Sequence, residues 1–119
     1  MNEKQVLNPI VSKGPLSGII PSIPALIFEK VEKEKIQKIY LFGSYAYGKP
    51  DEDSDVDICV IINNDLKRID IGVDIKNVLF DNDIIPSDLL VFRNNEFNES
   101  QNIRCIERTI VNRGILLYG

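Results

Sequence analysis

Residues 43–57 read GSYAYGKPDEDSDVD, and this stretch decides how the rest of the chain is interpreted. An apolar segment, 39–42, precedes it, and a second one, 56–62, begins inside it. Both are predicted strands, and the second is apolar on both faces, which is typical of the interior of a sheet. The stretch therefore places Gly-Ser and Asp-x-Asp at neighbouring strand ends.

The segments around these two strands predict one mixed sheet flanked by helices. We expect helices over 25–35, 66–80 and 97–113, a third strand over 84–92, and a short extended piece over 115–118. Strands that alternate with helices favour an α/β (α+β) fold with a single sheet. Residues 1–24 show no helical or strand period and are rich in Gly and Pro, so we expect an irregular N-terminal arm followed by one domain over 25–119.

Composition limits the classes of function. The chain has 119 residues, enough for one core, with 44% hydrophobic and 27% charged residues, as in globular proteins. A net charge of -4 makes nucleic acid an unfavourable partner, and the longest apolar run is too short to cross a membrane, so we expect a cytoplasmic protein. Histidine is absent, which excludes Ser-His and Cys-His catalysis. Cys59 and Cys105 lie in apolar segments and are predicted to be small buried hydrophobes.

The predicted helix over 66–80 carries two apolar faces. We expect the first face to join the core, and it contains Leu66, Ile69, Val73 and Phe80. The second ridge consists of Ile71, Ile75 and Val78. Either the N-terminal arm, with Ile10, Val11, Leu16, Ile19 and Ile20, folds over this second ridge, or the ridge docks another chain.

The loop after the first strand resembles a phosphate-binding loop but lacks one part of it. Gly43 to Lys49 match GxxxxGK, yet Pro50 stands where a P-loop needs a Ser or Thr hydroxyl and a continuing helix. We therefore set the P-loop aside. The Gly43-Ser44 pair keeps its meaning, because glycine lets backbone approach a phosphate closely and free N–H groups can bind the phosphate oxygens.

Asp55 and Asp57 lie two residues apart at the start of the second strand. Side chains at this spacing share one face of a strand, with Cα atoms about 6.5 Å apart, so the carboxylates can bind common cations. The simpler alternative is that the two acids only solvate a strand end. That alternative does not account for the Gly-Ser loop that precedes them.

Together these residues form the pattern GS-x-x-x-G followed by SD-x-D-x-x-V, and this pattern resembles the minimal nucleotidyltransferases of the DNA polymerase beta superfamily. The resemblance covers about residues 25–118, including the closing Arg113-Gly114-Ile115-Leu116-Leu117-Tyr118. It implies the nucleotidyltransferase fold. It also implies a third acid on a later strand, and Asp88 holds the matching position.

The resemblance implies a role for each site residue. Asp55, Asp57 and Asp88 would be the catalytic and metal-binding residues, for two Mg²⁺ ions with Mn²⁺ as the alternative, and Asp88 would also accept the proton of the attacking hydroxyl. The nucleotide-binding residues would be Gly43, Ser44, Gly48, Lys49 and Ser54. A solvated Lys49 is the plainer alternative for that side chain. Tyr47 replaces the arginine of many family members. Tyr45 and Tyr47 either pack on the nucleotide base or cover the short helix of the loop, and we expect a packing role.

The function implied is transfer of a nucleoside monophosphate, AMP from ATP, to a hydroxyl of another molecule. Similar small proteins act as antitoxins that modify a helical HEPN-type toxin, so such a protein is the expected partner, and a homo-oligomer is left open. Two alternatives remain at this point. In the first alternative, the chain is a binding-only antitoxin that neutralises its toxin by occlusion. In the second, it is a nucleotidyltransferase for a small molecule such as an antibiotic.

Overall fold

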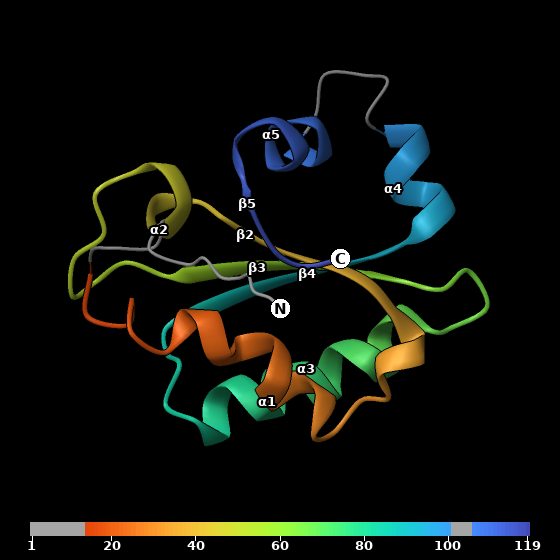
Figure 1. Cartoon of the computed structure of the whole chain (residues 1–119), viewed down its shortest axis with the longest axis horizontal. Helices are drawn as coiled ribbons and strands as arrows, with labels where there is room; N and C mark the ends of the chain where they lie inside the picture. The colour runs from red at the N-terminus through yellow and green to blue at the C-terminus, as the bar shows by residue number, and fades with distance from the viewer. Residues whose placement is uncertain (1–13, 101–105) are drawn as a thin grey trace.

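The computed structural model describes residues 14–100 and 106–119, and within them it contains one four-stranded mixed sheet (Figure 1). The strands are β2 (Ile36–Phe42), β3 (Val56–Ile62), β4 (Ser87–Arg93) and β5 (Ile115–Tyr118), in the order β4-β3-β2-β5. β2 pairs antiparallel with β3 and β5, whereas β3 and β4 are parallel. The prediction of a single mixed sheet flanked by helices is confirmed.

Helices cover both faces of the sheet. On one face lie α1 (Ile23–Phe28) and α3 (Arg68–Asp81), and on the other lie α4 (Asn94–Ser100) and α5 (Ile106–Arg113) (Figure 1). Successive side chains of β3 point to opposite faces of the sheet, and both faces are buried. Ile58 and Val60 pack in the core on the α1 and α3 side, while Cys59 and Ile61 pack toward α4 and α5. No helix within the described ranges is long and apolar enough to cross a membrane.

The N-terminal helix is shorter and begins earlier than predicted. A 3₁₀ turn, Ile20–Ser22, leads into α1, and a second 3₁₀ turn, Lys33–Lys35, replaces the end of the predicted helix over 25–35. Ile20 and Ile23 are fully buried, so this part of the predicted arm packs in the core. Residues 1–13 lie outside the described part of the chain, and the division of the chain at residue 24 stays a prediction.

The prediction for the faces of α3 is wrong. Ile71, Ile75 and Val78 are buried in the core together with Ile20, whereas the expected core residues Ile69, Val73 and Phe80 are exposed. The apolar side chains on the two faces are too similar in number for periodicity to distinguish them. Burial depends instead on α1 and the preceding 3₁₀ turn, which cover the second ridge as the first of the two alternatives expected.

The predicted helix over 97–113 is also wrong, because the chain forms two helices there, α4 from Asn94 and α5 from Ile106. Ile110 is buried against the sheet and Ile106 is exposed, while Ile103 and Cys105 lie outside the described residues. The strand predicted over 84–92 begins three residues later, at Ser87. The strand over 56–62 and the extended piece over 115–118 are confirmed.

Candidate active site

The Gly-Ser loop is held at the end of β2 by contact with Asp57. Gly43 has φ 72° and ψ -156°, and a Cβ at this position would clash with Oδ2 of Asp57. The loop then forms a single helical turn, α2 (Ser44–Tyr47), and a Cβ on Gly48 would lie 2.9 Å from the Cα of Ser44. Both glycines are therefore required by close approach, and Gly43 also by its left-handed backbone.

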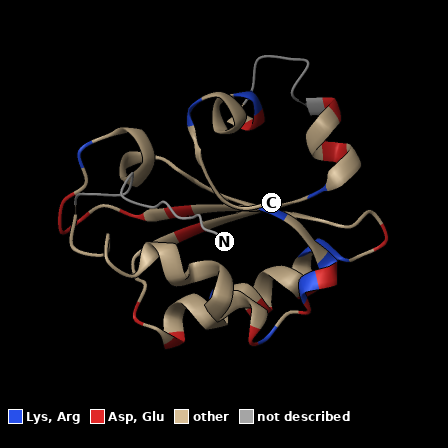
Figure 2. Cartoon of the chain, in the orientation of Figure 1, with Lys and Arg blue, Asp and Glu red and all other residues tan. Residues whose placement is uncertain are grey.

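The three predicted carboxylates lie together at the same end of the sheet. Asp57 and Asp88 are directly paired partners on the parallel strands β3 and β4, so their side chains share one face. Asp55 immediately precedes β3. Figure 2 shows acidic segments of β3 and β4 at the end of the sheet near α2.

Electrostatics indicates how close the three acids are. Partial burial of Asp57, reinforced by the neighbouring charges of Asp88 and then Asp55, raises the pKa of the Asp57 carboxyl from 3.8 to about 6. The charged form is therefore disfavoured where the three acids meet without a compensating cation. Loss of solvation and like-charge repulsion are the conditions that a bound cation relieves.

The donor chemistry fits hard divalent cations, although the side chains do not form a closed cage. Carboxylate oxygens are the ligands that Mg²⁺ takes in proteins, often only one or two together with substrate phosphates. Within the described residues no group of three Asp, Glu, Cys or His side chains converges tightly enough to enclose a metal ion by itself. A cation held by the paired Asp57 and Asp88 would therefore take its remaining ligands from phosphate oxygens or water.

Ser54 and Lys49 lie in the segment between α2 and β3. The Ser54 hydroxyl accepts a hydrogen bond from the backbone N–H of Asp51 at 2.9 Å and donates to Oδ1 of Asp51 at 3.2 Å, so it stabilises the turn before β3. The side chain of Lys49 is exposed. The predicted nucleotide contacts of these two residues remain predictions.

The two tyrosines of α2 occupy different surroundings. Tyr45 is buried, and its hydroxyl accepts a hydrogen bond from the backbone N–H of Leu16 at 3.3 Å, which confirms the expected packing. Tyr47 is partly exposed, and the guanidinium of Arg113 lies 4.4 Å from its ring centre. Arg113 therefore places a cation beside the loop.

Sequence reasoning missed this position of Arg113 because no local pattern connects residues 47 and 113. The connection runs through the sheet, where Ile115 of β5 pairs with Leu41 of β2, just before the loop. Gly114 permits this approach, since a Cβ there would lie 2.9 Å from the carbonyl oxygen of Leu41.

Cys59, which follows the acids on the same face of β3, is inert. Burial, together with the charge of Glu107, raises the pKa of its thiol to about 12. This agrees with the predicted role as a small buried hydrophobe.

Comparisons with known proteins agree with this geometry. Residues 26–113 match the family model of the nucleotidyltransferase domain. A Methanocaldococcus jannaschii protein that carries the name of a protein adenylyltransferase is 50% identical over 30 residues. That match spans 25% of this chain and 30% of the relative's length.

Solved structures extend the likeness to the fold. A toxin-antitoxin structure with AMP-PNP is 25% identical with a TM-score of 0.57, and 84% of this chain and 73% of that chain are covered. A mutant MntA-HpeT toxin-antitoxin structure gives 25% identity, a TM-score of 0.55, and coverage of 82% and 71%. A Sulfolobus solfataricus structure named for a nucleotidyltransferase shares only the fold, with 16% identity, a TM-score of 0.54, and coverage of 83% and 76%. Because the family model covers most of the chain, from the helix before β2 to the end of α5, the protein belongs to the nucleotidyltransferase domain family.

Proposed function

We propose that this nucleotidyltransferase transfers AMP from ATP, with Mg²⁺ or Mn²⁺, to a hydroxyl group of a partner protein, and that it serves as the antitoxin of a toxin-antitoxin pair. The observation that carries the proposal is the pairing of Asp57 with Asp88 beside Gly43, the residue whose backbone packs on Asp57. A phosphate-approaching loop and an uncompensated carboxylate pair thus lie in contact, as nucleotidyl transfer requires.

Each residue has a distinct part in the proposed reaction. Asp55, Asp57 and Asp88 would hold two divalent cations, which supply charge neutralisation at the phosphates. Ser44, with the backbone around Gly43 and Gly48, binds the triphosphate, and Ser54 and Lys49 contribute from the flanking turn. The acceptor oxygen bonds to the α-phosphorus, the bond from that phosphorus to the bridging oxygen breaks, and pyrophosphate leaves.

Asp88 accepts the proton of the attacking hydroxyl in this scheme. It is exposed on the edge strand β4, so an acceptor can reach it from outside the sheet. Asp57 lies one strand further in and is half-buried, which suits a residue that stays with the nucleotide. Arg113, which lies beside Tyr47 of the loop, and Lys49 would offset the triphosphate charge.

The proposal of a protein acceptor rests on the structural relatives of this chain. Those relatives are toxin-antitoxin structures, one with AMP-PNP, and they match over most of this chain. A toxin is therefore the proposed partner, and the family resemblance makes a helical HEPN-type toxin the candidate. Transfer to a small molecule and neutralisation by binding alone are the competing functions.

Mass measurement separates these functions. The protein is incubated with ATP, Mg²⁺ and the product of the adjacent gene, the candidate HEPN-type toxin, and the masses of both chains are measured. We expect the partner to gain the mass of AMP. Asp57→Asn and Asp55→Asn should abolish the gain and remain folded, because each removes a charge and no core packing. Partner neutralisation without any gain in mass would favour binding alone, and a folded, fully active Asp57→Asn variant would exclude this site.

A further inference from the structure

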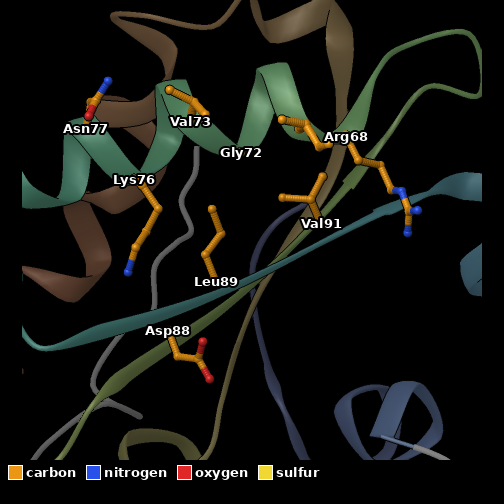
Figure 3. Close-up of a pocket in the computed structure, with 9 residues that line it drawn as sticks. Arg68, Gly72, Val73, Lys76, Asn77, Asp88, Leu89 and Val91 are labelled. Atoms are coloured by element: carbon orange, nitrogen blue, oxygen red, sulfur yellow. The ribbon is translucent and has the colours of Figure 1, made fainter.

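A groove runs between α3 and β4, on the face of the sheet opposite the carboxylates. Its volume is about 590 Å³, and Ile69, Gly72 and Val73 of α3 and Leu89 and Val91 of β4 form its apolar part. Gly72 contributes no side chain, which keeps the groove open in its middle. We call this feature the α3–β4 groove (Figure 3).

The helix beside the groove exposes large apolar side chains to solvent. Ile69 is 79% exposed, Val73 54% and Phe80 67%, and the three follow one another along a single face of α3. Isolated exposed apolar residues are ordinary, but a contiguous patch beside a groove marks an interaction surface. None of the three is needed to fill the core, which the opposite face of α3 fills with Ile71 and Ile75.

The groove adjoins the proposed active site across a single strand. Leu89 and Asp88 both line the groove, and the side chain of Asp88 points to the other side of β4, as Figure 3 shows. β4 is an edge strand with nothing paired on its outer side in the described sheet. A molecule seated in the groove therefore lies next to Asp88.

Charge in the groove favours a polypeptide with acidic as well as apolar residues. Arg68 and Lys76 line it, and Lys76 is tied to Ser87 by hydrogen bonds of 2.7 Å to the backbone oxygen and 3.1 Å to the hydroxyl. Arg68 lies 3.9 Å from Glu96, and both side chains are well exposed. An acidic side chain of a bound protein would therefore contact the guanidinium of Arg68 at one end of the groove, although this protein as a whole is acidic.

We propose that the α3–β4 groove docks the acceptor protein through an apolar segment flanked by acidic residues. This inference rests on the proposed function, because it takes the occupant to be the protein whose hydroxyl reaches Asp88. The nucleotide occupies the side of the carboxylates next to α2, so the acceptor has to arrive over the β4 edge, and the groove lies on that edge. A small polar acceptor would gain nothing from the exposed Ile69 and Val73.

Two matched substitutions test the docking surface. Ile69→Asp places a charge in the groove, and Ile106→Asp makes the same change at an exposed isoleucine of α5, on the opposite face of the sheet. The probe is the HEPN-type protein, titrated calorimetrically without nucleotide. We expect Ile69→Asp to weaken binding by about tenfold or more, as loss of an interface anchor does, and Ile106→Asp to bind like wild type.

A second variant, Gly72→Leu, guards against a trivial loss of fold. A Cβ at Gly72 meets only Cγ2 of Val91, at an ordinary 3.7 Å, so the side chain fills the groove while the helix is retained. It should weaken binding without lowering the melting temperature, because leucine is a better helix former than glycine.

The outcomes distinguish docking from catalysis. Equal binding by wild type, Ile69→Asp and Gly72→Leu, or no binding by wild type, would overturn the docking proposal. A complex that is weakened by the two groove variants, but in which wild type transfers no nucleotide, would support docking and overturn the proposed transferase function.

Discussion

Asp57→Asn should stabilise the fold in metal-free buffer while it removes activity, and the structure sets the size of the effect. A pKa raised from 3.8 to about 6 means that the folded protein holds the Asp57 proton more tightly than the unfolded chain does. At roughly 1.4 kcal/mol per pH unit, ionising the buried form would cost about 3 kcal/mol. Because the side chain is only half-buried, solvent screening reduces the expected gain to about 1 kcal/mol, or about 3–6 °C in melting temperature.

The sign and the pH window follow from the direction of the shift. The protonated Asp57 carboxyl contributes its full stabilisation below about pH 3.8, and this contribution is lost as pH rises through about 6. The stability advantage of Asp57→Asn over wild type should therefore be full at pH 8 and narrow toward pH 4. Thermal unfolding in excess chelator at pH 8 and pH 4 measures the difference in melting temperature between the variant and wild type. Asp65→Asn, in the loop after β3, removes an equal charge away from the cluster and serves as the control. An Asp57→Asn variant that melts below wild type at pH 8, or by a pH-independent margin, would refute the reasoning.

Three further predictions concern the loop, the metal and the core. ATP should raise the melting temperature only with Mg²⁺ or Mn²⁺, since three carboxylates repel a triphosphate, and an equal rise in chelator would instead indicate a site of backbone and Lys49 alone. Gly43→Ala should lose this ATP-dependent rise in melting temperature, because the added Cβ would clash with Asp57 and Gly43 has φ 72°. Gly18→Ala is the control in the same thermal-shift assay, since a Cβ added there meets nothing within 4 Å. Ile75→Lys should fail to fold by circular dichroism, because Ile75 is fully buried, and a folded variant would show that the faces of α3 are misassigned.

The β-sheet was predictable because its signals are local. The unbroken apolar run Ile58 to Ile62, directly after the acidic turn, predicts an interior strand, and the structure places β3 over Val56–Ile62. The convergence of Asp57 and Asp88 was inferred through the family resemblance, since strand order is not encoded in either segment. The structure supplies the missing link, the parallel pairing of β3 with β4.

The faces of α3 were not predictable, for a physical reason. Ile69 and Ile75 are equally apolar, and which of them is buried depends on α1, a helix distant in sequence that packs against one side only. A functional surface made of apolar residues has the same sequence pattern as a core face, so sequence alone does not distinguish the two. The proximity of Arg113 to Tyr47 was hidden for a related reason, because it arises from strand pairing between distant segments.

The pairing of β5 with β2 has a consequence for synthesis of the protein. The Gly-Ser loop leaves the ribosome early, but its neighbours Leu41 and Tyr47 obtain their partners, Ile115 and Arg113, only from the last described helix and strand. Domains complete their folding when such late segments become available. A nascent chain stalled before α5 would carry every carboxylate of the site and still lack the support of its loop, so the enzyme's competence should appear in one step once α5 and β5 have been synthesised.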